Sequence, residues 1–406
     1  MQLNNFDTEW FLREIWQQKP LVIRNAFANW ENPLSPDELA GLACEDDVET
    51  RLITYLPAPQ QITDKQLIDQ PQASGTWSTE HGPFAETRFS GLPPSHWTLL
   101  VQAVDHWLPE VAALIEPFRF IPDWRIDDVM VSYAEDGGSV GPHFDQYDVF
   151  LIQGLGQRRW QIGAYCDHNT PLLDNPQLRL LAEFATTEEW ILNPGDMLYV
   201  PPRFAHYGVG VGSDCMTYSV GFRAPGQAEL ISHWCDHVLE SVNDDDRYQD
   251  LNSELLLANN SRNNPGEITP QALEQLRKLA LEKLTDADAF RRWFGVHTTT
   301  PKYPEHDFSP EKPVTEKTLL SRLKKYGALH RSAASRFAFS RDADVILFVD
   351  GVSYHSLDTA FVEYLCAHKV WQQRDLAAWL DSTIAVELLC TLFNHGSVHF
   401  DESDTD

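Results

Sequence analysis

The stretch GPHFDQYDVFLIQGLGQRRW, residues 141–160, lies within a part of the chain, residues 124–222, where short β-rich runs alternate with glycine and proline. The runs are DDVMVSYA, YDVFLIQG, RRWQIG, EEWILNPGDMLYVPP and CMTYSVGFRA. Several short strands separated by turn residues are typical of a β-barrel or sandwich. We therefore expect residues 124–222 to form such a core and to carry the chemistry of the protein.

The same stretch holds a candidate metal site. His143 and Asp145 are two residues apart, a spacing that would put both side chains on one face of a strand. His206 follows the run NPGDMLYVPPRFA, in which a turn, a β run and a proline pair would bring it to the end of a strand. Two imidazoles and a carboxylate form the facial triad of non-haem Fe(II) oxygenases, which leaves positions open for a cosubstrate and O2. A His-x-Asp pair also arises by chance, but His206 and the glycines within residues 137–141 favour the metal.

Arg158 is the candidate partner of a cosubstrate. It follows Asp145 on the neighbouring predicted strand, where Arg159 would point to the opposite face. An α-keto acid that chelates iron needs a cation for its distal carboxylate, and a guanidinium binds a carboxylate bidentately. The alternative interpretation of Arg158 is an ordinary ion pair at the rim of the barrel.

The composition limits the classes of partner. The chain has 406 residues, with 31 Lys and Arg against 60 Asp and Glu, and its net charge is −29. This charge repels nucleic acids and anionic membranes and favours basic partners. Residues 301–406 hold 11 basic and 16 acidic residues, so most of the negative charge lies in residues 1–300.

Further features predict a cytoplasmic protein. No run approaches the roughly 20 apolar residues of a membrane span, and the first residues do not resemble a signal peptide. The six cysteines are scattered without a Cys-x-x-Cys pair, which is typical of reduced thiols.

Outside residues 124–222 the pattern is mostly helical. Before them we predict a helix over residues 9–18, a strand over 20–24, a helix capped by Ser35 with Pro36 at its first position, and a helix over 96–114. After them we predict helices over 229–242 and 270–295, then a proline-rich linker, 298–313, at a domain boundary. In the last part we predict a helix over 316–326, two strands over 336–340 and 344–349, and helices over 360–368, 375–380 and 384–393. This order is compatible with a winged helix.

Several motifs resemble one enzyme family. They are WQQKPLVI, SPDELAGLA, LLVQAVDHW, PDWRIDDVM, the stretch at 141–160, PGDMLYVPP and YSVGFRAP. The chain is similar to JmjC-type 2-oxoglutarate oxygenases of the ribosomal oxygenase group, and most of all to bacterial members that hydroxylate an arginine of large-subunit ribosomal protein sixteen. The resemblance is specific over most of residues 10–230 and fainter beyond them.

The resemblance implies a mixed α+β fold. Its core would be a double-stranded β-helix, the jelly roll of JmjC and cupin proteins, with flanking helices. Residues 1–226 would form the oxygenase domain, with the core at about 97–226. Residues 227–300 would form a helical dimerisation region, and residues 301–406 a winged-helix-like domain.

The resemblance also implies a chemistry and a partner. It assigns Fe(II) to His143, Asp145 and His206, with 2-oxoglutarate and O2 as cosubstrates. It assigns the distal carboxylate of 2-oxoglutarate to Arg158, with Ser132 nearby. Thr217 stands where the family has Asn, and Gln157 where it often has Arg, so the part that Thr217 takes in cosubstrate contacts is open. The product would be 3-hydroxyarginine on a basic ribosomal protein, made by a homodimer.

A second set of residues is expected to recognise the arginine. Buried charge needs a partner, and period 2 puts Asp128 on one face with Met130 and Ser132. We expect Asp128 to pair with the guanidinium, Met130 and Tyr147 to pack its aliphatic stem, and Ser219 to add a hydrogen bond. The alternatives are a capping or surface carboxylate for Asp128 and plain barrel core for Tyr147.

Other interpretations of the chain stay open. A histidine of a ribosomal protein could replace the arginine, or the chain could be a non-catalytic, cupin-type metal-binding regulator whose tail binds DNA. His233 and His237 are spaced as metal ligands on a helix, but their surroundings favour a helix surface or a dimer interface.

Overall fold

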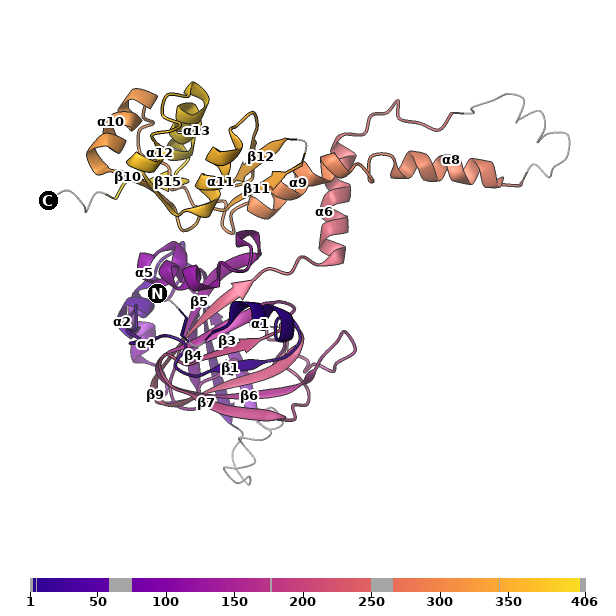
Figure 1. Cartoon of the computed structure of the whole chain (residues 1–406). Coiled ribbons are helices and arrows are strands. Elements are labelled where there is room, and N and C mark those ends of the chain that lie inside the picture. The colour runs from indigo at the N-terminus through magenta and orange to yellow at the C-terminus, as the bar shows by residue number, and fades with distance from the viewer. Residues whose placement is uncertain are drawn as a thin grey trace. The chain divides into compact units, whose positions relative to one another are not determined.

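The computed structural model describes residues 3–4, 6–57, 75–175, 177–249, 266–342 and 344–401. They divide into two compact units (Figure 1). The first is Met1–Ala224 with the short segments Glu305–Phe308 and Arg331–Ala334, and the second is the rest of the chain.

The first unit is built on a nine-stranded antiparallel sheet that curls into a barrel (Figure 1). β7 pairs with β6, and the other strands follow the order β1 (Leu21–Ile23), β8 (Met197–Val200), β6 (Asp148–Tyr165), β9 (Phe204–Phe222), β5 (Ile126–Ala134), β4 (Trp97–Val101), β2 (Thr50–Pro57) and β3 (Gly75–His81); β7 is Glu188–Leu192. This arrangement confirms the predicted mixed α+β jelly-roll class.

Two long strands, β6 and β9, form the middle of the sheet. β6 and β9 pair along their whole length, from Asp148 opposite Phe222 to Tyr165 opposite Phe204. The first part of β6 pairs with β8, and the later part pairs with β7. The register shifts between Gln153 and Gln157, where bulges bend the pair from one sheet toward the other.

Alternation along the strands separates two apolar faces. Phe150 and Ile152 pack in the large outer core, together with the N-terminal helices. Val149 and Leu151 point the other way and pack with Trp160 inside the barrel. Burying one such large side chain contributes roughly 2 to 3 kcal/mol, so the outer core holds the helices on the sheet and leaves the inner face for the site.

Short helices precede and cover the sheet. They are α1 (Thr8–Glu14), α2 (Pro36–Leu42), α4 (Glu86–Ser90), η2 (Val104–His106), α5 (Pro109–Ala112), η3 (Ala113–Phe118) and η4 (Asp123–Arg125). α2 begins as predicted, with the Ser35 side chain as N-cap, Pro36 at the first turn and Glu38 closing a capping box.

The predicted helix over residues 96–114 is wrong for its first part, whereas its second part is confirmed by the short helices η2, α5 and η3. Residues 97–101 form β4, which lies between β2 and β5 and has every residue buried. The helical spacing of its leucines arises because both faces of a central strand are apolar, with Leu99 in the outer core and Leu100 on the inner side. β2 and β3 were not predicted from the sequence either.

The second unit contains helices and two three-stranded sheets. The helices are α6 (Gln227–Glu240), α8 (Pro270–Leu281), α9 (Ala287–Thr299), α10 (Glu316–Tyr326), α11 (Thr359–Ala367), α12 (Gln373–Leu376) and α13 (Thr383–Asn394). One sheet has the order β14 (Val370–Gln372), β10 (Ala328–Arg331), β15 (Val398–His399), and the other β11 (Phe337–Arg341), β12 (Val345–Val349), β13 (Val352–Tyr354). The predicted order is confirmed for α10, β11, β12, α11, α12 and α13, whereas β10, β13, β14 and β15 were not predicted.

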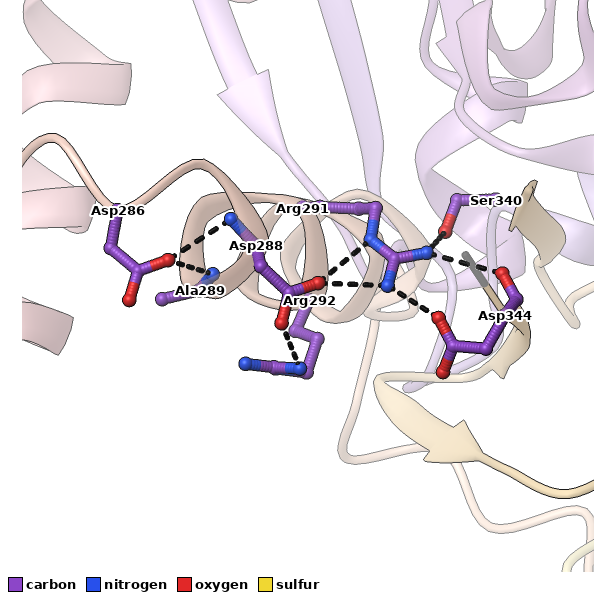
Figure 2. Close-up of polar contacts among 7 residues, drawn as sticks. All are labelled: Asp286, Asp288, Ala289, Arg291, Arg292, Ser340 and Asp344. Atoms are coloured by element: carbon purple, nitrogen blue, oxygen red, sulfur yellow. Dashed lines mark hydrogen bonds and ion pairs between the residues drawn. The ribbon is translucent and has the colours of Figure 1, made fainter. Parts of the chain in front are cut away.

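α9 packs tightly on the second of these sheets (Figure 2). The Arg291 guanidinium donates to Asp344 Oδ1 at 2.6 Å and to Asp288 Oδ1 at 2.8 Å. The Asp286 side chain caps the helix by accepting from two backbone N–H groups. A Cβ added at Gly295 would lie 2.3 Å from the Phe348 ring, so this glycine sets how closely α9 approaches β12.

The described residues can be searched for membrane-spanning helices and for disulfides. None of their helices is long and apolar enough to cross a bilayer. All six cysteines lie among these residues, and none of them forms a disulfide there.

Candidate active site

Two histidines meet across the mouth of the barrel. His143 lies in the loop between β5 and β6, and His206 is near the start of β9. Their backbones form an isolated bridge, with His143 N–H donating to His206 O at 3.1 Å and His206 N–H to His143 O at 2.8 Å. The ring centroids are 4.3 Å apart.

The Asp145 carboxylate lies close to both imidazole rings. Its Oδ2 lies 3.8 Å from His143 Nε2 and 3.6 Å from His206 Nε2. One candidate ligand atom from each of the three residues lies within 4.8 Å of the others. The expectation that His143 and Asp145 share a strand is wrong: both lie in a loop, whose shape is set by Gly141 and held by a hydrogen bond from Arg203 N–H to Asp145 O at 2.7 Å.

Backbone contacts fix which nitrogen of each ring is available. His143 Nδ1 donates to Gly141 O at 2.8 Å, and His206 Nδ1 donates to Phe204 O at 2.9 Å. The lone pair of each Nε2 is therefore on the side of Asp145, as it is in metal-binding histidines oriented by a second hydrogen bond. Burial, and then the neighbouring His143, lower the pKa of His206 to about 4, so its ring is neutral at pH 7. This donor set fits a divalent transition metal.

Two glycines make room for the loop. Gly141 has a φ of +83°, which side-chain-bearing residues rarely adopt, and a Cβ there would lie 2.4 Å from Leu180. A Cβ at Gly138 would lie 2.1 Å from the carbonyl oxygen of Trp97. The loop can reach His206 because neither position carries a side chain.

Arg158 is buried deeper in the barrel, with 5% of its surface exposed. Its Nη1 donates to Ser132 Oγ at 3.2 Å and to Thr217 Oγ1 at 3.4 Å. Ser132 and Thr217 are register partners on β5 and β9. Among the residues that the structure describes, no carboxylate pairs with Arg158, and its Nε has no partner. A buried cation is costly without a counter-ion, so the surroundings of Arg158 fit an anion such as the distal carboxylate of 2-oxoglutarate.

Two residues without a role in the sequence interpretation join these groups. Trp160 lies between Arg158 and His206, with the guanidinium 5.5 Å from one Trp160 ring centroid and the His206 ring 6.1 Å away. Gln153 Oε1 accepts from Thr217 Oγ1 at 3.2 Å and so orients that hydroxyl. Alternation from Arg158 along β6 would have indicated Trp160, whereas the Gln153 contact depends on the register of β6 against β9.

Asp128 lies on the inner face, as predicted. It is 5% exposed, and its Oδ1 lies 3.8 Å from where a Cβ of Gly221 would be, on the face of β9 that carries Ser219. Its Oδ2 accepts from the N–H of Ala103, the residue before η2, at 3.0 Å, so the carboxylate also makes a structural contact.

The other expected substrate contacts lie around Asp128. Ser219 pairs with Met130 across β9 and β5, and Met130 packs against Leu100. Tyr147 is 43% exposed, so it is not plain barrel core. Partial burial, followed by the charges of Asp145 and Asp128, raises the pKa of Tyr147.

The fold and the domain families define the class of protein. The JmjC domain family matches residues 113–230, and the ROXA-like winged helix family matches residues 282–399. The antiparallel barrel and the JmjC match define a JmjC-domain protein.

Relatives narrow this class to one family. The chain is 35% identical over 397 residues to the ribosomal protein uL16 3-hydroxylase of Escherichia coli K12, covering 96% of this chain and 97% of the relative. It is 39% identical over 293 residues to a probable ribosomal oxygenase of Haemophilus influenzae, covering 70% and 66% of the two chains. The structure of YcfD, a ribosomal oxygenase from Escherichia coli in complex with cobalt and 2-oxoglutarate, matches with a TM-score of 0.79 at 33% identity over 98% of this chain and 99% of that one. The chain belongs to the ribosomal oxygenase family.

Proposed function

We propose that this chain is an Fe(II)- and 2-oxoglutarate-dependent oxygenase that hydroxylates C3 of an arginine in a large-subunit ribosomal protein. The observation that carries the proposal is the convergence of His143, Asp145 and His206 beside a buried Arg158 that lacks a carboxylate partner among the described residues. A relative that is named as a uL16 3-hydroxylase supports the class of substrate.

In this proposal each residue of the metal site has one task. His143, Asp145 and His206 hold the metal, and Gly141 O and Phe204 O keep both imidazoles in the tautomer that can bind it. Bound iron would supply, with O2 and 2-oxoglutarate, the oxidising chemistry that an unactivated C–H bond requires. The cobalt in the related structure supports a divalent metal, and iron is our assignment from the ligand set.

In this proposal, neighbouring groups of residues would bind the cosubstrate and the substrate. Arg158 would bind the distal carboxylate of 2-oxoglutarate, with the Ser132 and Thr217 hydroxyls fixing the guanidinium. Asp128 would pair with the substrate guanidinium while its second oxygen stays on Ala103 N–H. Holding the reacting carbon at a fixed position beside the metal is the protein's main contribution to the rate.

The partner and the assembly follow from charge and exposed apolar surface. A net charge of −29 attracts a basic ribosomal protein, and a ribosomal substrate is consistent with a cytoplasmic enzyme. α8 buries none of its twelve residues, and Leu273 and Leu276 on it are 54% and 44% exposed. Apolar surface of this kind marks an interaction site, and we assign it to a second copy of the chain.

The test is aerobic incubation with Fe(II), 2-oxoglutarate and the candidate ribosomal protein, followed by peptide mass spectrometry. We expect one added oxygen atom on an arginine. An oxygen on a histidine, or no product, would contradict the proposal. Asp128→Asn retains an oxygen for Ala103 N–H but removes the charge, so it should weaken arginine hydroxylation, whereas Asp127→Asn serves as the matched control.

A further inference from the structure

The second unit contains a cluster of metal-ligating side chains that the oxygenase chemistry does not use. Glu229 and His233 lie one turn apart on α6, and His297 is in the last turn of α9. One candidate ligand atom from each of them lies within 4.8 Å of the others. His233 and His297 have their ring centroids 5.1 Å apart.

The two helices that carry these residues are firmly packed. Trp234 and Val238 of α6 form a buried cluster with Trp293 of α9. Trp234 Nε1 also donates to Leu284 O at 3.0 Å, just before α9 begins. The packing of α6 on α9 therefore fixes the spacing of the three candidate ligands.

The candidate ligands are themselves oriented. The His297 ring stacks on Trp293 with centroids 4.9 Å apart and planes 12° from parallel. Glu229 Oε2 accepts from Gly226 N–H at 3.2 Å, which holds the carboxylate at the start of the helix. A carboxylate has several acceptor positions, so this bond leaves capacity for a metal.

We propose that Glu229, His233 and His297 bind a divalent transition metal ion of the zinc class, which clamps α6 to α9. Two imidazoles and one carboxylate at this spacing are a common zinc ligand set, and water takes the fourth position. From the sequence, His233 and His237 had the spacing of metal ligands on this helix. The proposed set instead combines His233 with Glu229 and, from α9, with His297. His237 instead lies against Trp234, with ring centroids 5.7 Å apart, and is outside the cluster.

The geometry gives a matched pair of variants. His233→Ala removes a proposed ligand, and His237→Ala removes an exposed histidine one turn away on the same helix. Both side chains are exposed, so neither substitution should disturb folding, and circular dichroism checks this. Zinc should also fill the candidate metal site of the first unit, since zinc binds nitrogen and oxygen ligands at least as tightly as iron does. His143→Ala therefore reports on that other site.

The experiment is zinc titration of the full, untagged, chelator-stripped chain, followed by calorimetry and metal analysis. We expect two zinc ions per chain for the unaltered protein and His237→Ala, and one for His233→Ala and for His143→Ala. Zinc should also raise the melting temperature of His237→Ala more than that of His233→Ala. Retention of both ions by His233→Ala, or equal losses in His233→Ala and His237→Ala, would overturn this site. Retention of both ions by His143→Ala would instead count against the metal site of the proposed function alone.

Discussion

At the scale of single residues, the candidate oxygenase site depends on groups whose partners are fixed before any ligand binds. His143 and His206 each give their Nδ1 proton to a backbone carbonyl, and Arg158 rests on two hydroxyls inside the barrel. Such preorganisation lowers the cost of binding, since the side chains have little freedom left to lose.

The first prediction concerns Arg158. Arg158→Met should raise the KM for 2-oxoglutarate at least thirtyfold, because losing one partner of a buried charge pair costs about 2 kcal/mol or more. The measurement is the rate of succinate formation against 2-oxoglutarate concentration. Arg159→Met is the matched control, since Arg159 lies on the other face of β6. Unchanged kinetics in Arg158→Met would exclude the proposed role.

Sequence reasoning reached the site residues but not all of their surroundings. The His-x-Asp pair and His206 were found from spacing and residue chemistry, although the two ligands lie in a loop and not on a strand. Trp160 could have been found from its alternation with Arg158 along β6, whereas the Gln153 contact depends on which residues of β6 and β9 face each other. The bond from Ala103 to Asp128 joins positions distant in the sequence, which no local pattern can predict.

At the scale of elements, capping residues and hydrophobic spacing correctly predicted the helices that depend on interactions between residues close in the sequence. Ser35 and Glu38 cap α2 as a capping box predicts, and α10 has the bounds expected from its spacing. Residues 97–101 were predicted wrongly because pairing with β2 and β5, and not local propensity, makes them a strand.

A buried cluster fixes the start of β6 in the barrel. Asp148 is fully buried and accepts hydrogen bonds from Tyr199 Oη at 2.6 Å, Gln17 Nε2 at 2.9 Å and Arg125 Nη2 at 3.2 Å. Burial raises the pKa of Asp148, although these three donors favour its charged form. The carboxylate thus ties β6 to β8, to η4 and to the turn after α1.

We predict that Asp148→Asn lowers the free energy of unfolding by about 3 to 5 kcal/mol, because it leaves the Arg125 charge without its buried partner. Denaturant unfolding measures this change. Glu274→Gln is the control, since its pair with Arg277 is exposed on both sides and contributes about 1 kcal/mol or less. Equal effects of the two substitutions would show that the Asp148 cluster does not hold β6.

At the scale of the whole molecule, negative charge and exposed apolar surface point to partners. The excess of acidic residues lies mostly in residues 1–300, which include the JmjC match. Long-range attraction would speed the encounter with a basic protein and would weaken with salt. In the proposed dimer, the exposed leucines of α8 would form a different kind of contact, which is apolar and insensitive to salt.

The assembly prediction uses those leucines. Changing Leu273 and Leu276 together to Glu should raise the dimer dissociation constant at least a hundredfold, because burying one leucine contributes about 1.5 to 3 kcal/mol. Light scattering coupled to size-exclusion chromatography measures the mass. Gln271→Glu on the same helix should leave the dimer intact. A dimer that survives the double substitution would exclude α8 as the contact.

The central claim is that His143, Asp145 and His206 hold the metal on which 2-oxoglutarate turnover depends. The most direct measurement is succinate released by the full chain and by His143→Ala, with Fe(II), O2 and 2-oxoglutarate present. The His143 side chain is partly exposed and its backbone bridge to His206 remains in the variant, so thermal unfolding should show a folded protein. We predict succinate from the unaltered chain and none from His143→Ala, and succinate production retained by the folded variant would contradict the account.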